Sequence, residues 1–233
     1  MHRRNFLRTG AVATTGLGLG LTGTHQASAT PRRAPLRVHT VLYDGVEEQD
    51  FAGHVEVLGI LADQRRIKQT FVSADGPGRV ATMSGLEIAI RAPWSPRSAD
   101  ILVVPGGGYG DESAVAEQIR RGVLPKALAR AQRPGLIMAG VCTGTMLLSA
   151  ARIADGRPCT THHIAKEDLE AQGGKVVPGR VVDDGDLVTC GGVTSGLDLG
   201  LWLIERLYGH EDALFAEKVL EYERRGTVWR AAS

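Results

Sequence analysis

Apolar residues along the chain form short runs that are separated by longer amphipathic stretches. Four runs predict strands, at residues 36–43, 67–74, 100–108 and 135–142. The runs made of Val, Ile and Leu without polar alternation are typical of strands buried on both faces of a parallel sheet. Shorter strands are predicted in a hairpin at 79–93 with its turn at Ser84–Gly85, at 157–163, and twice within 174–192.

Helices are predicted between these strands. In the first, at residues 51–63, Val55, Leu58 and Leu61 share one face at helical spacing. The others lie at 113–131, with a break or kink at Pro125, and at 143–153, 165–174, 195–209 and 211–223. This alternation predicts an α/β fold: a doubly wound, mostly parallel sheet with helices on both faces, as in a flavodoxin-like sandwich.

The topology directs attention to the carboxyl ends of the strands, because ligands of such sheets bind outside that edge. The segments that follow the predicted strands are 44–50, 105–109, 142–145, 161–163 and 190–198. Candidate chemistry is therefore expected in these five segments.

The first 29 residues are set aside as a leader. Arg3–Arg4 precedes a mildly apolar run, and Ala27–Ser28–Ala29 offers a cleavage site. This pattern resembles a Tat-type export signal, although a plain N-terminal tail or an uncleaved anchor are the alternatives. We expect a single domain at 30–233, exported by the Tat route to the extracellular, periplasmic or cell-wall space.

Composition changes this picture little. The 27 basic and 26 acidic residues leave a net charge of +1 without blocks of like charge, so neither nucleic acid nor stable membrane insertion is indicated. The three cysteines, Cys142, Cys159 and Cys190, leave at least one thiol free, and pairing of the last two stays open. No CxxC or HExxH motif occurs, so we expect no metal and no cofactor.

Cys142 stands at the corner between a buried strand and a helix. Gly140 and Gly144 flank it, which is the cysteine version of the nucleophile elbow. The start of a helix also favours a thiolate, so the spacing predicts a reactive thiol with a lowered pKa. The alternative is a buried core cysteine at a tight turn.

The glycine-rich stretch at 105–110 is a weak nucleotide motif. We expect instead that the Gly107 and Thr143 amides form an oxyanion hole, with Gly108 beside the substrate, unless the stretch is merely a turn.

Three further segments carry ionisable side chains with two interpretations each. Asp50 is either the cap of the first helix or a carboxyl group that faces the cysteine. His162 and His163 either activate the thiol or are structural. Asp198 is either a charge in the first turn of a helix or a site carboxylate.

These motifs together resemble the ThiJ/PfpI superfamily, and within it the isonitrile hydratase group. The resemblance is carried by VCTG at 141–144, ADGRPCTTH at 154–162 and GGVTSGLDL at 191–199. It implies Cys142 as nucleophile, Asp50 as its acidic partner, and a functional role for Asp198. Two departures from the pattern, His54 and His163, are expected to line the substrate pocket. A homodimer acting on a small molecule is also implied.

Three functions are compatible with this resemblance. The first is hydration of an isonitrile to an N-substituted formamide through a cysteine thioimidate, which is the reaction of a hydro-lyase. The second is a glyoxalase-like or deglycase-like activity on reactive carbonyls. The third is a secreted binding or redox-sensing protein without turnover. Asp50 in place of glutamate and Thr143 after the cysteine favour the first over the second.

Overall fold

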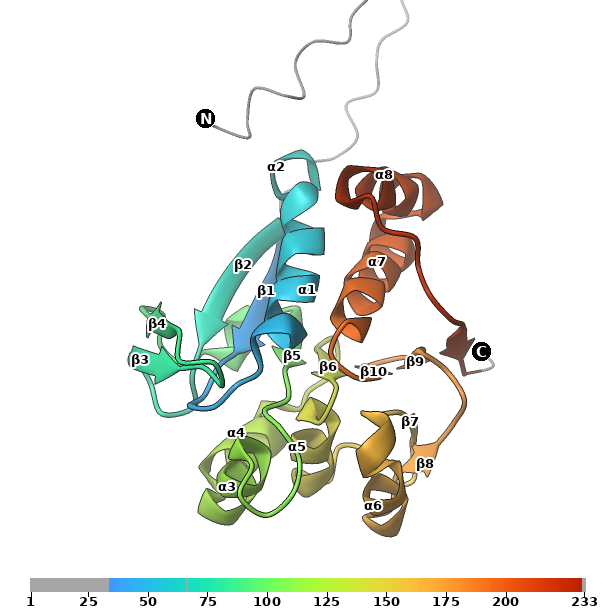
Figure 1. The fold of residues 1–233 in the computed structure, drawn as a ribbon. Helices are drawn as coiled ribbons and strands as arrows, with labels where there is room; N and C mark the ends of the chain where they lie inside the picture. Colours follow the sequence, from blue (N-terminus) through green and yellow to red (C-terminus); the bar gives the residue numbers. More distant parts are fainter. Residues whose placement is uncertain (1–33, 66, 232–233) are drawn as a thin grey trace, which may run out of the picture. The chain divides into compact units, whose positions relative to one another are not determined.

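A central sheet of seven strands organises the fold (Figure 1). The computed structural model describes residues 34–65 and 67–231. Across the sheet the strands are β11 (Val228–Arg230), β9 (Val181–Asp184), β10 (Leu187–Cys190), β6 (Ile137–Val141), β5 (Ile101–Val104), β1 (Leu36–Val41) and β2 (Ile67–Val72). Neighbouring strands are parallel except β9 and β10. The predicted doubly wound α/β fold is confirmed.

Helices cover both faces of this sheet (Figure 1). The elements α1 (Glu48–Ile60), α7 (Ser195–Tyr208) and α8 (His210–Leu220) lie on one face, with α2 (Ala62–Arg65) after α1. The other face carries α3 (Ala114–Arg121), α4 (Val123–Ala131) and α5 (Gly144–Ala150). Beyond α5 a small unit contains β7 (Pro158–Cys159), α6 (Lys166–Ala171) and β8 (Lys175–Val176). Each face thus has its own apolar core.

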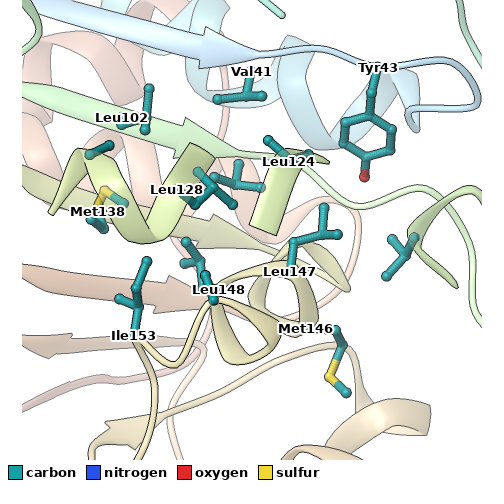
Figure 2. Packing of buried hydrophobic residues seen from close by; sticks show 14 of the residues in the cluster. Val41, Tyr43, Leu102, Leu124, Leu128, Met138, Met146, Leu147, Leu148 and Ile153 are labelled. Atoms are coloured by element: carbon teal, nitrogen blue, oxygen red, sulfur yellow. The ribbon is translucent and has the colours of Figure 1, made fainter. Parts of the chain in front are cut away.

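One core is seen from close by in Figure 2. Leu124 and Leu128 of α4 and Leu147 of α5 are almost fully buried beside apolar residues of the strands. Burying a leucine side chain contributes about 2 kcal/mol, so this layer holds α5 firmly against the sheet. Because α5 starts just after Cys142, the same packing fixes the corner that carries the thiol.

The order of the strands places the predicted site segments together. The chain leaves β1 for the edge strand β2 and then returns to the other side of β1 to form β5 and β6. The connections that follow β1 and β5 therefore separate in opposite directions, and a crevice opens at this point of parallel sheets. The segments after β1, β5 and β6 carry Asp50, Gly106 and Cys142.

Several local predictions change in the structure. The helix predicted at 113–131 is broken at Gly122, which has a φ of +66° between α3 and α4; Pro125 sits in the first turn of α4, where its missing N–H costs nothing. The segment 174–192 forms three strands, not two, and β11 was not foreseen because it has only three residues. The hairpin is confirmed, as β3 (Gly78–Ala81) and β4 (Glu87–Ile90).

The leader predicted at residues 1–29 lies outside the described residues. Within the described part of the chain, no helix is both long enough and apolar enough to cross a bilayer.

Candidate active site

Cys142 occupies a strained corner at the end of β6. Its φ is +56°, a left-handed conformation that costs a non-glycine residue about 1 kcal/mol or more. Hydrogen bonds hold the corner in place: the Cys142 N–H donates to the Gly191 carbonyl at 3.0 Å, and the Thr161 hydroxyl donates to the Cys142 carbonyl at 2.9 Å. Strain held by its surroundings in this way is typical of a functional residue.

The glycine after the corner is required by packing. A Cβ on Gly144 would collide with the Val104 carbonyl oxygen and approach the Pro105 carbonyl oxygen to 2.8 Å. Any side chain here would therefore push α5 away from the end of β5. The glycine brings the Cys142 corner against the glycine-rich loop that follows β5.

Asp50 reaches the same corner from α1. It lies inside the first turn of the helix, whose cap is Glu47, so the interpretation of Asp50 as the N-cap is wrong. Its carboxyl group is fully buried, and Oδ2 accepts a hydrogen bond from the Gly106 N–H at 2.9 Å. Oδ1 has no conventional hydrogen-bond partner among the described residues. Burial raises the pKa of Asp50 to about 7, with smaller opposing effects from the Gly106 N–H and the Cys142 thiol.

The Cys142 thiol lies beside the Asp50 carboxyl group, and each group shifts the pKa of the other. Burial, followed by the charge of Asp50, raises the pKa of the Cys142 thiol to about 12. The Val193 and Thr143 N–H groups near the sulfur oppose this rise. The predicted lowering of the thiol pKa is therefore wrong, because α5 is short and burial outweighs the helix end. The two acids compete for protons, and the more acidic Asp50 proton is the one available near neutral pH.

The glycine-rich loop after β5 differs from the prediction in one respect. The Gly107 N–H donates to the Thr143 hydroxyl at 3.3 Å, so it is not free to bind an oxyanion. Gly106, which sequence reasoning passed over, is the loop residue that supports the acid. A Cβ on Gly106 would collide with the Thr143 hydroxyl and with Asp50 Oδ2, so only glycine allows this contact.

A pocket of about 130 Å³ opens over the sulfur. Its lining includes the predicted residues Cys142, Thr143, Gly108 and His162. It also includes residues that sequence reasoning missed, namely Glu47, Met83, Tyr109, Ile164 and Val193. Of these, Val193 could have been predicted from the sequence, since it follows two glycines at a strand end. In the structure it has a φ of +44°, and its N–H lies near the sulfur.

His162 is placed to act as a hydrogen-bond donor in this pocket. Its Nδ1 accepts the Ile164 N–H at 3.3 Å, so in the neutral ring the proton sits on Nε2. Burial lowers the pKa of His162, which favours that neutral form. His163 stacks on His162 with ring centres 4.4 Å apart but is exposed and does not line the pocket, contrary to the prediction.

His54 is also absent from the pocket lining. It lies one helical turn after Asp50 and is fully buried, with Nε2 at 2.9 Å from the Thr40 hydroxyl and Nδ1 at 3.3 Å from the Asp50 carbonyl. Burial lowers the pKa of His54 to about 4, so the ring is neutral. His54 therefore supports α1 from beneath and does not contact a substrate in the pocket.

Asp198 is not brought into the pocket either. Its Oδ2 accepts hydrogen bonds from Arg180 Nε at 2.5 Å and from the Tyr222 hydroxyl at 2.9 Å. Its Oδ1 accepts the Arg225 N–H at 2.9 Å. Both carboxylate oxygens are thus occupied, which corrects the expectation that Asp198 faces the reacting groups.

Cys142, Cys159 and Cys190 are all free, so the last two do not form a disulfide. The described residues contain no cluster of three His, Cys, Asp or Glu side chains that is suited to a metal ion.

The sequence and the fold match known proteins. A family model described as the DJ-1/PfpI family matches residues 36–206. The chain belongs to the DJ-1/PfpI family. An isonitrile hydratase from Pseudomonas putida is 30% identical over 188 residues, covering 80% of this chain and 78% of that protein. The Parkinson disease protein 7 homolog of Danio rerio is 29% identical over 186 residues, covering 76% and 92%.

A solved structure of this DJ-1/PfpI family supports the same assignment. The crystal structure of a ThiJ/PfpI family protein from Pseudomonas syringae superimposes with a TM-score of 0.74 at 25% identity, covering 89% of this chain and 83% of that one.

Proposed function

We propose that this protein is a cysteine-dependent hydratase that adds water to an isonitrile and releases an N-substituted formamide. The observation that carries the proposal is the buried pair formed by Cys142 and Asp50. Asp50 has a pKa of about 7, so it can both give and take a proton at neutral pH, which suits general acid–base catalysis. Among the described residues, no lysine or arginine lines the pocket to hold an anionic substrate.

The first step forms a bond between sulfur and carbon. In the reactive state Asp50 is a carboxylate and Cys142 a thiol. The Asp50 carboxylate takes the thiol proton as the Cys142 sulfur attacks the terminal carbon of the isonitrile, and then passes that proton to the carbon. The product is a thioimidate, R–N=CH–S–Cys142, and Asp50 is left as a carboxylate. The Val193 and Thr143 N–H groups beside the sulfur favour the sulfur while it carries negative charge.

The second step consumes water. The Asp50 carboxylate takes a proton from a water molecule, whose oxygen attacks the thioimidate carbon, and the proton passes to the nitrogen. The carbon–sulfur bond then breaks, the hydroxyl proton returns to the Cys142–Asp50 pair, and R–NH–CHO leaves. His162 Nε2–H is the donor in the pocket that can stabilise the nitrogen or oxygen during these transfers.

The similarity to the Pseudomonas putida isonitrile hydratase is consistent with this proposal at the level of the family, to which proteins with other names also belong. Methylglyoxal hydration and protein deglycation use the same kind of nucleophile, so they are included as competing assays.

The deciding experiment measures formamide production from a small isonitrile such as cyclohexyl isocyanide, together with loss of methylglyoxal. We expect wild type to hydrate the isonitrile, and Cys142→Ala to lose this activity entirely because no nucleophile remains. Cys159→Ala is the matched control, since Cys159 is a buried thiol outside the pocket. Conversion of methylglyoxal but not of isonitrile by wild type would refute the proposal.

We also propose that the protein acts as an exported homodimer, on the basis of the Arg3–Arg4 leader and the family resemblance. Expression of the full chain in a Tat-competent bacterium, with and without Arg3→Lys and Arg4→Lys, tests export. Equal amounts of both forms outside the cytoplasm would contradict it. Light scattering of the purified protein measures its mass.

A further inference from the structure

Two hollows share a wall above Cys142. The inner one is the pocket of about 130 Å³ that contains the sulfur, and the outer one has a volume of about 650 Å³. Met83, Gly108 and Tyr109 line both. The two hollows are therefore adjacent, and a substituent too long for the inner pocket would have to pass these three residues to reach the outer hollow.

We infer that the outer hollow binds the substituent on the isonitrile nitrogen, and that this substituent is an extended, neutral and mainly apolar group. The inference rests on the proposed function, because it assigns the part of the substrate that does not react. Sites for small organic molecules usually measure about 300–1,000 Å³, so the inner pocket alone holds only the reacting end. The outer hollow supplies the missing volume.

The rim of the inner pocket carries three large apolar side chains. Met83, Tyr109 and Ile164 are 50%, 43% and 48% exposed, and all three line the inner pocket. Large apolar side chains gathered at a pocket mouth expose surface that a ligand can cover. Each methylene that they bury on a bound chain favours binding about fourfold.

Hydrogen bonds hold this rim in place without a ligand. Glu48 accepts hydrogen bonds from the Ser84 N–H at 2.8 Å and from the Thr82 hydroxyl, which fixes the hairpin turn that carries Met83. The Tyr109 hydroxyl donates to Asp168 Oδ2 at 2.5 Å. The backbone that carries Met83 and the side chain of Tyr109 are therefore held in position without a substrate. Such preorganisation reduces the entropic cost of binding.

The charges along the two hollows argue against an anionic substituent. The lining residues include the carboxylates of Glu47, Glu112 and Glu117 and no lysine or arginine. Glu117 is paired with Arg120, whereas neither Glu47 nor Glu112 pairs with a described cation. A negatively charged group would be repelled along the whole path to Cys142.

The test uses alkylation of Cys142, which reports on the hollow without requiring turnover. Rate constants are measured for N-ethyl, N-octyl and N-carboxypentyl maleimide, by mass spectrometry of Cys142, and are divided by the rate constants with glutathione. We expect the octyl reagent to react at least about tenfold faster than the ethyl reagent after this correction, which is the gain from burying about two of its six additional methylenes, and the carboxylate reagent to be slowest.

Glu112→Trp reduces the volume of the outer hollow without changing the inner pocket, since Glu112 lines only the outer hollow. We expect it to reduce the octyl-to-ethyl ratio to near one. Glu211→Trp, on the distant helix α8, is the matched control and should keep the wild-type ratio. The same ratio is then measured as kcat/KM for octyl and ethyl isocyanide.

Each outcome decides between the possibilities. No preference for octyl in wild type, or an equal loss in both variants, overturns the inference. If a second copy of the chain covers the hollow, wild type shows no preference and Glu112→Trp lowers the mass seen by light scattering, which also overturns it. A preserved alkylation preference without hydration of any isocyanide refutes the proposed reaction but retains the outer hollow as a substituent site.

Discussion

Asp50 and Asp198 are two buried aspartates with opposite surroundings. Both lie in the first turn of a helix that follows a strand of the same sheet, and they are 0% and 2% exposed. Asp198 is paired with Arg180 and has both oxygens occupied. Asp50 has no cationic partner among the described residues, one occupied oxygen, and a thiol as its neighbour.

This difference shows that burial alone does not determine what a carboxyl group does. Burial without a cation disfavours the charged form, so Asp50 holds a proton at a pKa of about 7. Asp198 instead forms an ion pair with a guanidinium, and its contacts join the loop before β9 to the segment after α8. The surroundings of Asp50 therefore favour proton transfer, whereas those of Asp198 favour stabilisation of the folded state.

The largest expected effect concerns turnover. Asp50→Asn should lower kcat for isonitrile hydration by about 10²- to 10⁴-fold, because the amide cannot donate and recover a proton. Asparagine can still accept the Gly106 N–H, so circular dichroism should show an intact fold. A variant with full kcat would remove Asp50 from the mechanism.

Asp198→Asn should show the reverse pattern, with lost stability and a kcat close to wild type. Breaking a fully buried ion pair costs about 3–5 kcal/mol, and the Arg180 side chain is 24% exposed, so we expect a loss of about 2 kcal/mol. Denaturation in urea measures this loss. A large fall in kcat at unchanged stability would place Asp198 in the reaction after all.

Asp50 should also make the stability of the protein depend on pH. The raised pKa of Asp50 means that the folded state binds a proton that the unfolded state has released between about pH 4 and pH 7. Its contribution is therefore full below pH 4 and is lost as the pH rises through about 7. Relative to wild type, Asp50→Asn should gain about 4 kcal/mol between pH 4 and pH 8, because each of the roughly three pKa units corresponds to about 1.4 kcal/mol. A constant difference across that range would contradict the assigned protonation.

The smallest expected effect is that of Tyr222→Phe. It removes one hydrogen bond to Asp198 and keeps the Arg180 pair, so the loss of stability should be about 1 kcal/mol. Thermal unfolding measures it. A loss as large as that of Asp198→Asn would show that the hydroxyl, and not the ion pair, joins the C-terminal segment to α7.

The sequence by itself determined the fold class and the place of the site. Runs of Val, Ile and Leu without alternation require burial on both faces, and parallel strands end at one edge, so Cys142, Thr143, Gly108 and His162 were found from local pattern. The need for a glycine at position 144 could also be predicted from the sequence, since a strand-to-helix corner leaves no room for a side chain. These features depend on neighbours in the chain, which the sequence displays directly.

Only the tertiary structure decided what the ionisable groups do. Arg180 and Tyr222 reach Asp198 from segments on either side of α7, and Gly106 reaches Asp50 from the loop after β5. The same holds for the thiol, whose pKa follows burial and Asp50 more than the start of a short helix. A carboxyl or thiol group responds to the charges and solvent within a few ångströms, and folding brings those neighbours from distant parts of the chain.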